Sequence, residues 1–223
     1  MTAMTQTRLT GTQCWSSSHD GRFQHLMVLF HGANSSGELI APLGGRISRA
    51  LPNTYVFSPN GPKPTGDHRF GWLGEPRLEN PAEPPGEPYD RLSRDINQTL
   101  DLYQEEFGLA DADTIFVGIA EGAAAALGAA LTRPRRIAGV LCFAGPMSMP
   151  PELLDEIRSR PPVCLIHGNG GSKFSPDSLS ATYRFLKRAG VPLTSHMCRT
   201  AKHDINGEAF SHGTRFLSKV LDQ

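Results

Sequence analysis

The sequence lacks the features that assign a chain to a membrane, to a nucleic acid or to the secretory route. No apolar run approaches the roughly 20 residues that a helix needs to cross a bilayer. The 223 residues carry a net charge of +0, with a pI of about 7.1, which gives no electrostatic attraction to nucleic acid or to an anionic membrane. Residues 1–20 hold no basic stretch followed by an apolar core, so we expect no secretory signal and a cytoplasmic protein.

Cysteine is also scarce, and its spacing matches no metal motif. Most of the cysteines lie inside apolar runs, which predicts small buried side chains in a reducing compartment. The four are Cys14, Cys142, Cys164 and Cys198. We find no i, i+4 partner or carboxylate spacing that suggests a metal for His25, His68, His196 or His212. We therefore expect no metal site and no cofactor.

What is present is an alternation of apolar runs and helical patterns. The runs predicted as strands are 8–15, 25–30, 54–58, 114–119, 137–143, 163–167 and 193–198. Helical patterns cover 89–107, 123–131 and 178–189, and a closing helix carries Phe210, Phe216, Leu217 and Val220. This alternation predicts one α/β domain over residues 1–223, with a mostly parallel central sheet and helices on both faces. The first two strands are expected to form an antiparallel, hairpin-like pair.

Residues 59–88 interrupt this alternation, because they are rich in proline and glycine. The segment is too long for a plain connection. Loops of this length are often lids or binding loops, so we expect a loop over the carboxyl edge of the sheet. A surface excursion without fixed structure is the alternative.

One pentapeptide, Gly118-Ile119-Ala120-Glu121-Gly122, lies where a strand is predicted to turn into a helix. It has the frame of the nucleophile elbow G-x-S-x-G, in which two glycines permit a tight turn that lifts the central side chain above the sheet. Here that side chain is the methyl group of Ala120, which cannot attack a carbonyl. The pattern therefore predicts the architecture of a serine hydrolase without its nucleophile.

Four predicted strand ends carry polar or glycine-rich sequence, and in an open α/β sheet such ends meet at one rim. They are residues 31–37, the Ala120 elbow, residues 167–172 and residues 201–204.

A series of short motifs in a fixed order resembles a known family from about Leu26 to the C-terminus. The motifs are His31-Gly32, Ser58-Pro59-Asn60-Gly61, Trp72, the elbow, Phe143-Ala144-Gly145, His167-Gly168 and a late histidine. In this order the chain resembles the bacterial phospholipase/carboxylesterase group of α/β-hydrolases, which includes acyl-protein thioesterases. The resemblance implies the α/β-hydrolase fold in a single domain.

The resemblance also implies roles for individual residues. Ala120 occupies the nucleophile position, His203 matches the general base, and Gly171 stands where the catalytic aspartate is expected. Backbone N–H groups of Glu121 and of the loop near Ala33 match the oxyanion hole. Further residues assigned to binding are His31, Asn34 and Trp72, and Asn169 replaces an acidic residue often found in this loop.

Other residues could take over the missing roles. Asp204 adjoins His203, but neighbouring side chains on a loop rarely point together. We expect Asp177 to support a helix start and the Glu121 carboxylate to face solvent or line the pocket. Serines near the predicted rim are Ser35, Ser36 and Ser148, and none lies on a strained turn.

Three interpretations of function follow. The first is an esterase, phospholipase or thioesterase-like protein with a degenerate triad and very weak or no ester hydrolysis. The second is a non-catalytic binding or regulatory protein that holds a small apolar or acyl ligand. The third is a structural partner that forms a homodimer. Ala120 could be an engineered change that traps a complex or a natural loss, and Gly171 favours natural loss because a trapping variant would keep the aspartate.

Overall fold

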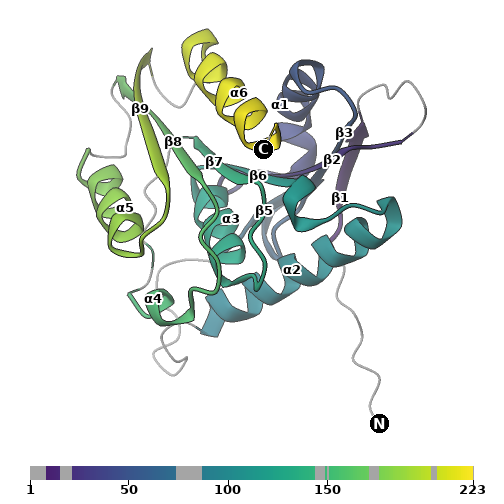
Figure 1. Ribbon diagram of the computed structural model, residues 1–223, viewed down its shortest axis with the longest axis horizontal. Helices are drawn as coiled ribbons and strands as arrows, with labels where there is room; N and C mark the ends of the chain where they lie inside the picture. The colour runs from purple at the N-terminus through teal and green to yellow at the C-terminus, as the bar shows by residue number, and fades with distance from the viewer. Residues whose placement is uncertain are drawn as a thin grey trace.

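Seven strands form the central sheet of the protein (Figure 1). The computed structural model describes residues 9–15, 22–73, 87–143, 149, 151–170, 176–201 and 205–222. The strands are β1 (Gly11–Trp15), β2 (His25–Phe30), β3 (Thr54–Pro59), β6 (Thr114–Ile119), β7 (Gly139–Phe143), β8 (Val163–Gly170) and β9 (Leu193–Ala201). Their order is β1-β3-β2-β6-β7-β8-β9. All neighbours are parallel except β1 and β3. The predicted α/β fold with a mostly parallel sheet is confirmed.

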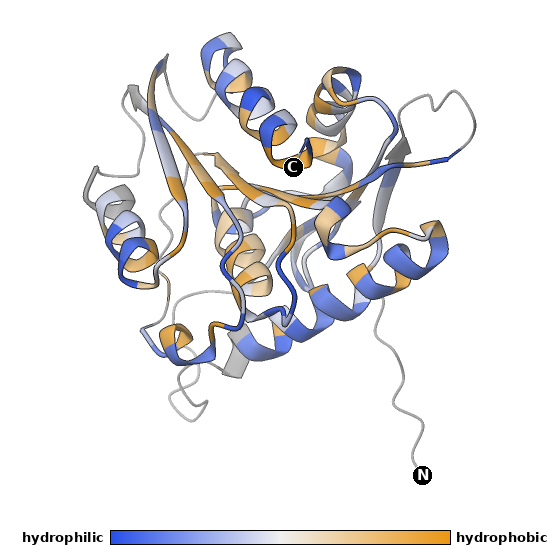
Figure 2. Cartoon of the chain, in the orientation of Figure 1, coloured by the Kyte–Doolittle hydropathy of each residue, from blue (hydrophilic) through white to orange (hydrophobic). Residues whose placement is uncertain are grey.

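Helices cover both faces of this sheet (Figure 1). They are α1 (Gly37–Ala50), α2 (Glu87–Phe107), α3 (Glu121–Thr132), α4 (Leu153–Glu156), α5 (Pro176–Arg188) and α6 (Gly207–Leu221), with a short 3-10 helix at Asp111–Asp113. Residues of α1 and α6 join one hydrophobic cluster, and residues of α2, α3 and α5 join the other. The strands between them are apolar on both sides, as Figure 2 shows for the middle of the sheet. Strands β2 and β6 are therefore almost entirely buried, which matches their continuous apolar sequence.

Two local expectations differ from the structure. Strand β1 is antiparallel, as expected, but its partner is β3 and not the next strand in the sequence. Helix α1 was not predicted, because Pro42 and several glycines interrupt its pattern. Ser36 caps the start of this helix: its hydroxyl accepts the Leu39 N–H at 3.3 Å, which satisfies one free donor of the first turn.

The proline- and glycine-rich segment holds a small hairpin in its first half. Strands β4 (Lys63–Gly66) and β5 (Arg69–Gly71) pair antiparallel. Ser35 and Phe70 exchange two backbone hydrogen bonds of 3.2 and 2.7 Å, so the hairpin lies against the loop that follows β2. Residues 74–86 lie outside the described residues, and the function of the segment as a lid stays a prediction.

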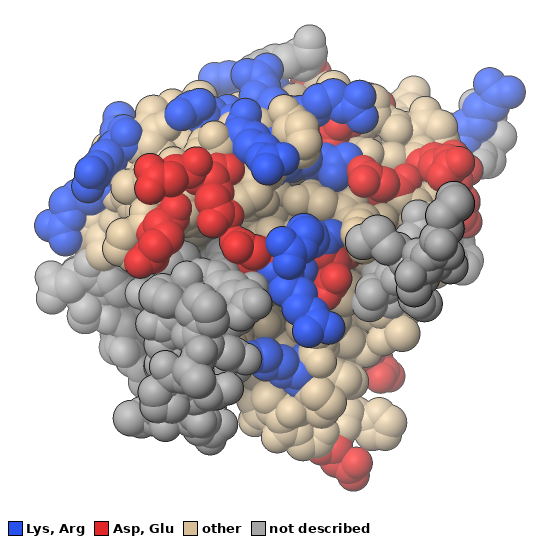
Figure 3. Space-filling model, turned by 90° about the horizontal axis from the view of Figure 1, so that it is seen from below, with Lys and Arg blue, Asp and Glu red and all other residues tan. Residues whose placement is uncertain are grey.

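Charged groups of both signs lie side by side on the face below α2 (Figure 3). Two of the charged side chains are buried: the Arg133 guanidinium, with only 5% of the side chain exposed, contacts the buried Asp111 and reaches the exposed Asp101 at 2.6 Å. Within the described ranges, no helix is both long and apolar enough to cross a membrane.

Candidate active site

The turn from β6 into α3 has an uncommon backbone conformation. Ala120 lies there with φ of 52° and ψ of −120°. The other described non-glycine residues with positive φ are Asn34, Asn53 and His68, whose polar side chains tolerate that region better. For a residue with a Cβ this conformation costs on the order of 1–3 kcal/mol and persists only where the surroundings enforce it. The Ala120 N–H donates to the Phe143 carbonyl at 2.9 Å, which ties the turn to the end of β7.

The two flanking glycines are required because backbone passes close to both. A Cβ on Gly118 would lie 2.4 Å from the Ala123 Cα, and a Cβ on Gly122 would lie 2.3 Å from the His31 carbonyl oxygen. Neither contact is possible for a real side chain. The glycine spacing read from the sequence therefore marks a tight strand-to-helix turn packed against the end of β2.

The loop after β2 lies beside Ala120. A Cβ built on Gly32 would be 3.6 Å from the Ala120 methyl group. Ala33 and Asn34 follow on the exposed side of this loop. The Asn34 side-chain oxygen accepts the Thr65 hydroxyl at 3.1 Å, so β4 supports the loop from outside. The structure thus brings the expected Ala33 loop to the elbow, and the assignment of its N–H to an oxyanion hole stays a prediction.

His31 and Trp72 hold this loop from within. Both are buried, with exposed fractions of 0% and 1%, and their ring centroids are 5.0 Å apart. The Trp72 indole N–H donates to the His31 carbonyl at 2.8 Å. The His31 Nε2 accepts the Gly61 N–H at 2.9 Å, while Nδ1 lies 2.7 Å from the Gly32 carbonyl and is therefore the protonated nitrogen. In this structure the two rings support the rim, and a direct role in ligand binding stays a prediction.

Burial lowers the pKa of His31 below its ordinary value of 6.5, although the Gly32 carbonyl and Glu121 act in the opposite direction. In the unfolded chain this imidazole takes up a proton near pH 6.5, whereas in the folded protein it does so only at lower pH. The stabilising contribution of neutral His31 is therefore present above pH 6.5 and is lost as the pH falls toward the folded pKa.

We expect the free energy of unfolding, measured in urea between about pH 7.5 and pH 5.5, to decrease toward acid. The variant His31→Gln should flatten part of this dependence, because its amide can accept the Gly61 N–H but does not titrate. Some slope should remain, since burial also lowers the pKa of His25 and of His196. An unchanged slope in the variant would show that His31 does not contribute.

Glu121 joins the elbow to the chain that follows β5. Its two carboxylate oxygens accept the N–H groups of Trp72 and Leu73, each at 3.1 Å. The side chain is partly exposed, and whether it also lines a ligand pocket stays a prediction. The carboxylate fixes the position of Trp72 beside the elbow, and through Trp72 the position of the His31 loop.

We expect Glu121→Ala to lower the free energy of unfolding by about 1–3 kcal/mol, because it removes two charge-assisted hydrogen bonds and leaves the Trp72 N–H without its acceptor. Glu105→Ala, on the exposed side of α2, is the matched control and should change stability by less than about 0.5 kcal/mol. Thermal unfolding of the two variants side by side checks this expectation. Equal melting temperatures would contradict it.

The other two positions that the family resemblance assigns to a triad, Gly171 and His203, lie outside the described residues, and their roles stay predictions. The strands that precede them are described, and they end together: Gly170 of β8 pairs with Ala201 of β9. Strands β6, β7, β8 and β9 are parallel neighbours, so the described ends of β8 and β9 lie at the same carboxyl edge of the sheet as the end of β6, which Ala120 follows (Figure 1).

Two supports of the site have no recognisable sequence signal. The Glu121 contacts join residues 49 and 48 positions apart. The Asn60 side chain accepts the Gly37 N–H at 2.8 Å, which fixes the start of α1 to the end of β3.

A parallel sheet with a strained turn after β6 and a helix packed behind it defines the α/β-hydrolase class. A family model described as phospholipase/carboxylesterase matches residues 16–221, and the chain belongs to that family. It is similar to the esterase YpfH of Escherichia coli strain K12, with 22% identity over 92% of this chain and 86% of that protein.

Solved structures agree with this assignment. The crystal structure of esterase PE8 has a TM-score of 0.83 and 26% identity, covering 96% of this chain and 99% of the other. The Arabidopsis thaliana protein SOBER1 has a TM-score of 0.76 and 18% identity, covering 88% and 99%. This second likeness concerns the fold.

Proposed function

We propose that this member of the phospholipase/carboxylesterase family carries Ala120 in the position of the nucleophile and hydrolyses esters very weakly or not at all. The observation that supports the proposal is the backbone of Ala120, with φ of 52° and ψ of −120° between two obligatory glycines. This is the kind of sharp, strained strand-to-helix turn that presents a serine in an α/β-hydrolase. The turn presents a methyl group here.

The chemistry of the family explains why this substitution matters. A serine hydroxyl attacks a carbonyl once histidine takes its proton, and a carboxylate orients that histidine and stabilises its cation. With alanine at position 120 there is no attacking atom. With glycine at position 171 the carboxylate expected there is also missing. Even where the triad is removed, the oxyanion hole and the binding of substrate can leave a rate on the order of 10³–10⁴-fold above that of the reaction in water.

The test is activity-based labelling of the full chain with a fluorophosphonate, together with hydrolysis of p-nitrophenyl acetate. We expect no stoichiometric labelling and no turnover above that of the His203→Ala variant. The variant Ala120→Ser is the positive control for access of the probe to the elbow. Labelling of any serine in the unaltered chain would disprove the proposal, because it would reveal a nucleophile elsewhere.

A further inference from the structure

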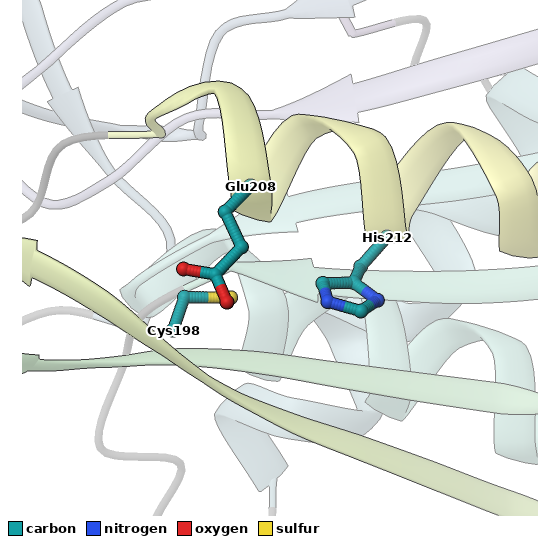
Figure 4. A group of neighbouring side chains, drawn as sticks. All are labelled: Cys198, Glu208 and His212. Atoms are coloured by element: carbon teal, nitrogen blue, oxygen red, sulfur yellow. The ribbon is translucent and has the colours of Figure 1, made fainter.

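A cysteine, a glutamate and a histidine come together between β9 and α6, away from the elbow. Cys198 lies on β9, and Glu208 and His212 lie one turn apart on α6 (Figure 4). The thiol sulfur, a carboxylate oxygen and an imidazole nitrogen all lie within 4.8 Å of one another. Figure 4 shows the thiol directly beside the carboxylate, with the His212 ring next along the same side of the helix.

The surroundings hold these three side chains in place. Cys198 is fully buried, whereas Glu208 reaches solvent and His212 is half-buried. One Glu208 oxygen accepts the Arg199 N–H at 3.1 Å, so the carboxylate is fixed to β9. The His212 ring stacks on His196, with centroids 3.9 Å apart and an angle of 20° between the planes. Asn206 caps α6 through Ala209 and also donates to the Arg199 carbonyl at 3.2 Å, which fixes the helix start beside the strand.

Thiolate, imidazole and carboxylate are together the donor set of Zn²⁺, and harder cations such as Mg²⁺ and Ca²⁺ favour oxygen alone. Bonds of about 2.0–2.3 Å in a tetrahedron place neighbouring donor atoms about 3.3–3.8 Å apart. In this structure the three donor atoms lie within 4.8 Å of one another, a limit about 1 Å longer than the upper end of that range. Binding of Zn²⁺ therefore requires the side chains of Glu208 and His212, which both reach solvent, to rotate toward the buried Cys198 thiol.

We propose that Cys198, Glu208 and His212 form a zinc site with three protein ligands and a fourth position open to water on the side of Glu208. The site is independent of ester chemistry and stands whether or not the elbow is active. Among the described residues, no other group of three such donors lies this close.

Such a site would join β9 to α6 across the connection that carries His203. Metal bound to the folded protein alone stabilises it, so the melting temperature should rise with zinc concentration. Zinc binds the thiolate, and binding therefore releases the proton of the Cys198 thiol, whose pKa burial and Glu208 raise.

The spacing of Glu208 and His212, four residues apart on one helix, was readable in the sequence, and the statement that His212 has no i, i+4 carboxylate partner is wrong. The third ligand could not be found in that way. Cys198 comes from a strand, and only the packing of α6 on β9 brings its thiol to the pair.

The experiment is titration of the full, metal-free chain with Zn²⁺ by calorimetry, followed by Co²⁺ as a spectroscopic replacement. We expect one equivalent of Zn²⁺ and a thiolate-to-cobalt charge-transfer band. Cys198→Ala and His212→Gln should each weaken binding by more than about 100-fold, beyond the effect of losing an outer-sphere partner. Two control variants lie outside the proposed site. Cys164→Ala removes another buried thiol from the hydrophobic cluster that contains Cys198, and His68→Ala removes a histidine elsewhere in the chain. Both variants should bind Zn²⁺ as tightly as the parent does.

Absence of one-equivalent binding at micromolar Zn²⁺, or equal binding by His212→Gln and the parent, would overturn the proposal. If Cys198→Ala does not fold, Glu208→Gln and His212→Gln decide the outcome, because both positions lie on the accessible side of α6. Loss of binding in the Cys164→Ala control to the same extent would also overturn it, since that result would place the metal elsewhere.

Discussion

Ala120→Ser combined with Gly171→Asp is expected to hydrolyse p-nitrophenyl acetate at least about 100-fold faster than the unaltered chain. The serine would supply the attacking oxygen at the turn after β6, and the aspartate would orient His203 and stabilise its cation. Triad members act as a unit, and removal of the serine alone costs on the order of 10⁶ in turnover in a well-studied serine protease. Recovery of even a small part of this loss in turnover would be readily measured.

The single changes separate the two contributions. Ala120→Ser alone should give less activity than the double variant, and Gly171→Asp alone should give none above the parent. The matched control is the double variant with His203→Ala, which keeps both new side chains and removes the base. Equal rates for the double variant and this control would show that one of the three positions is wrongly assigned.

Gly122→Val should lower the free energy of unfolding by about 3 kcal/mol or more. A Cβ at this position would lie 2.3 Å from the His31 carbonyl oxygen and 2.4 Å from that of Phe30. Both atoms belong to the backbone at the end of β2, so no side-chain rotation relieves the overlap. Helix α3 would have to move away from the sheet, and the contacts of its buried alanines would be lost.

Gly45→Ala is the matched control for this variant. Gly45 lies inside α1 with nothing within 4 Å of a built Cβ, so alanine should raise stability by about 0.5–1 kcal/mol through helix propensity. Chemical denaturation of both variants gives the comparison. A Gly122→Val protein that unfolds together with the parent would show that the close approach of α3 to β2 is wrong.

Much of the fold was predictable because its strands are continuous apolar runs. Strands β2 and β6 begin and end as predicted, and both are buried on two faces. Helix α1 was not predicted, because Pro42 and its glycines imitate a loop in sequence although the helix accommodates them. The pairing of β1 with β3 could not be read locally, since the paired residues are 40 to 48 positions apart.

The candidate site also has one part that the sequence predicts and one part that it does not. The elbow was predictable because its requirement for two glycines is local and steric. The hydrogen bonds of the Glu121 carboxylate could not be predicted, because its partners, the N–H groups of Trp72 and Leu73, come from a loop far away in sequence. Polar side chains near a rim can serve the backbone as readily as a ligand, and only the fold decides between the two.

The backbone at Ala120 has a consequence for reversibility. Its conformation is enforced by Gly118, Gly122 and the bond to Phe143, none of which involves the side chain at position 120. The turn therefore keeps its shape whichever small residue it carries. Every alanine codon is a single base change from a serine codon, so a hydroxyl at this position is one mutation away, and the backbone that would present it is already in place.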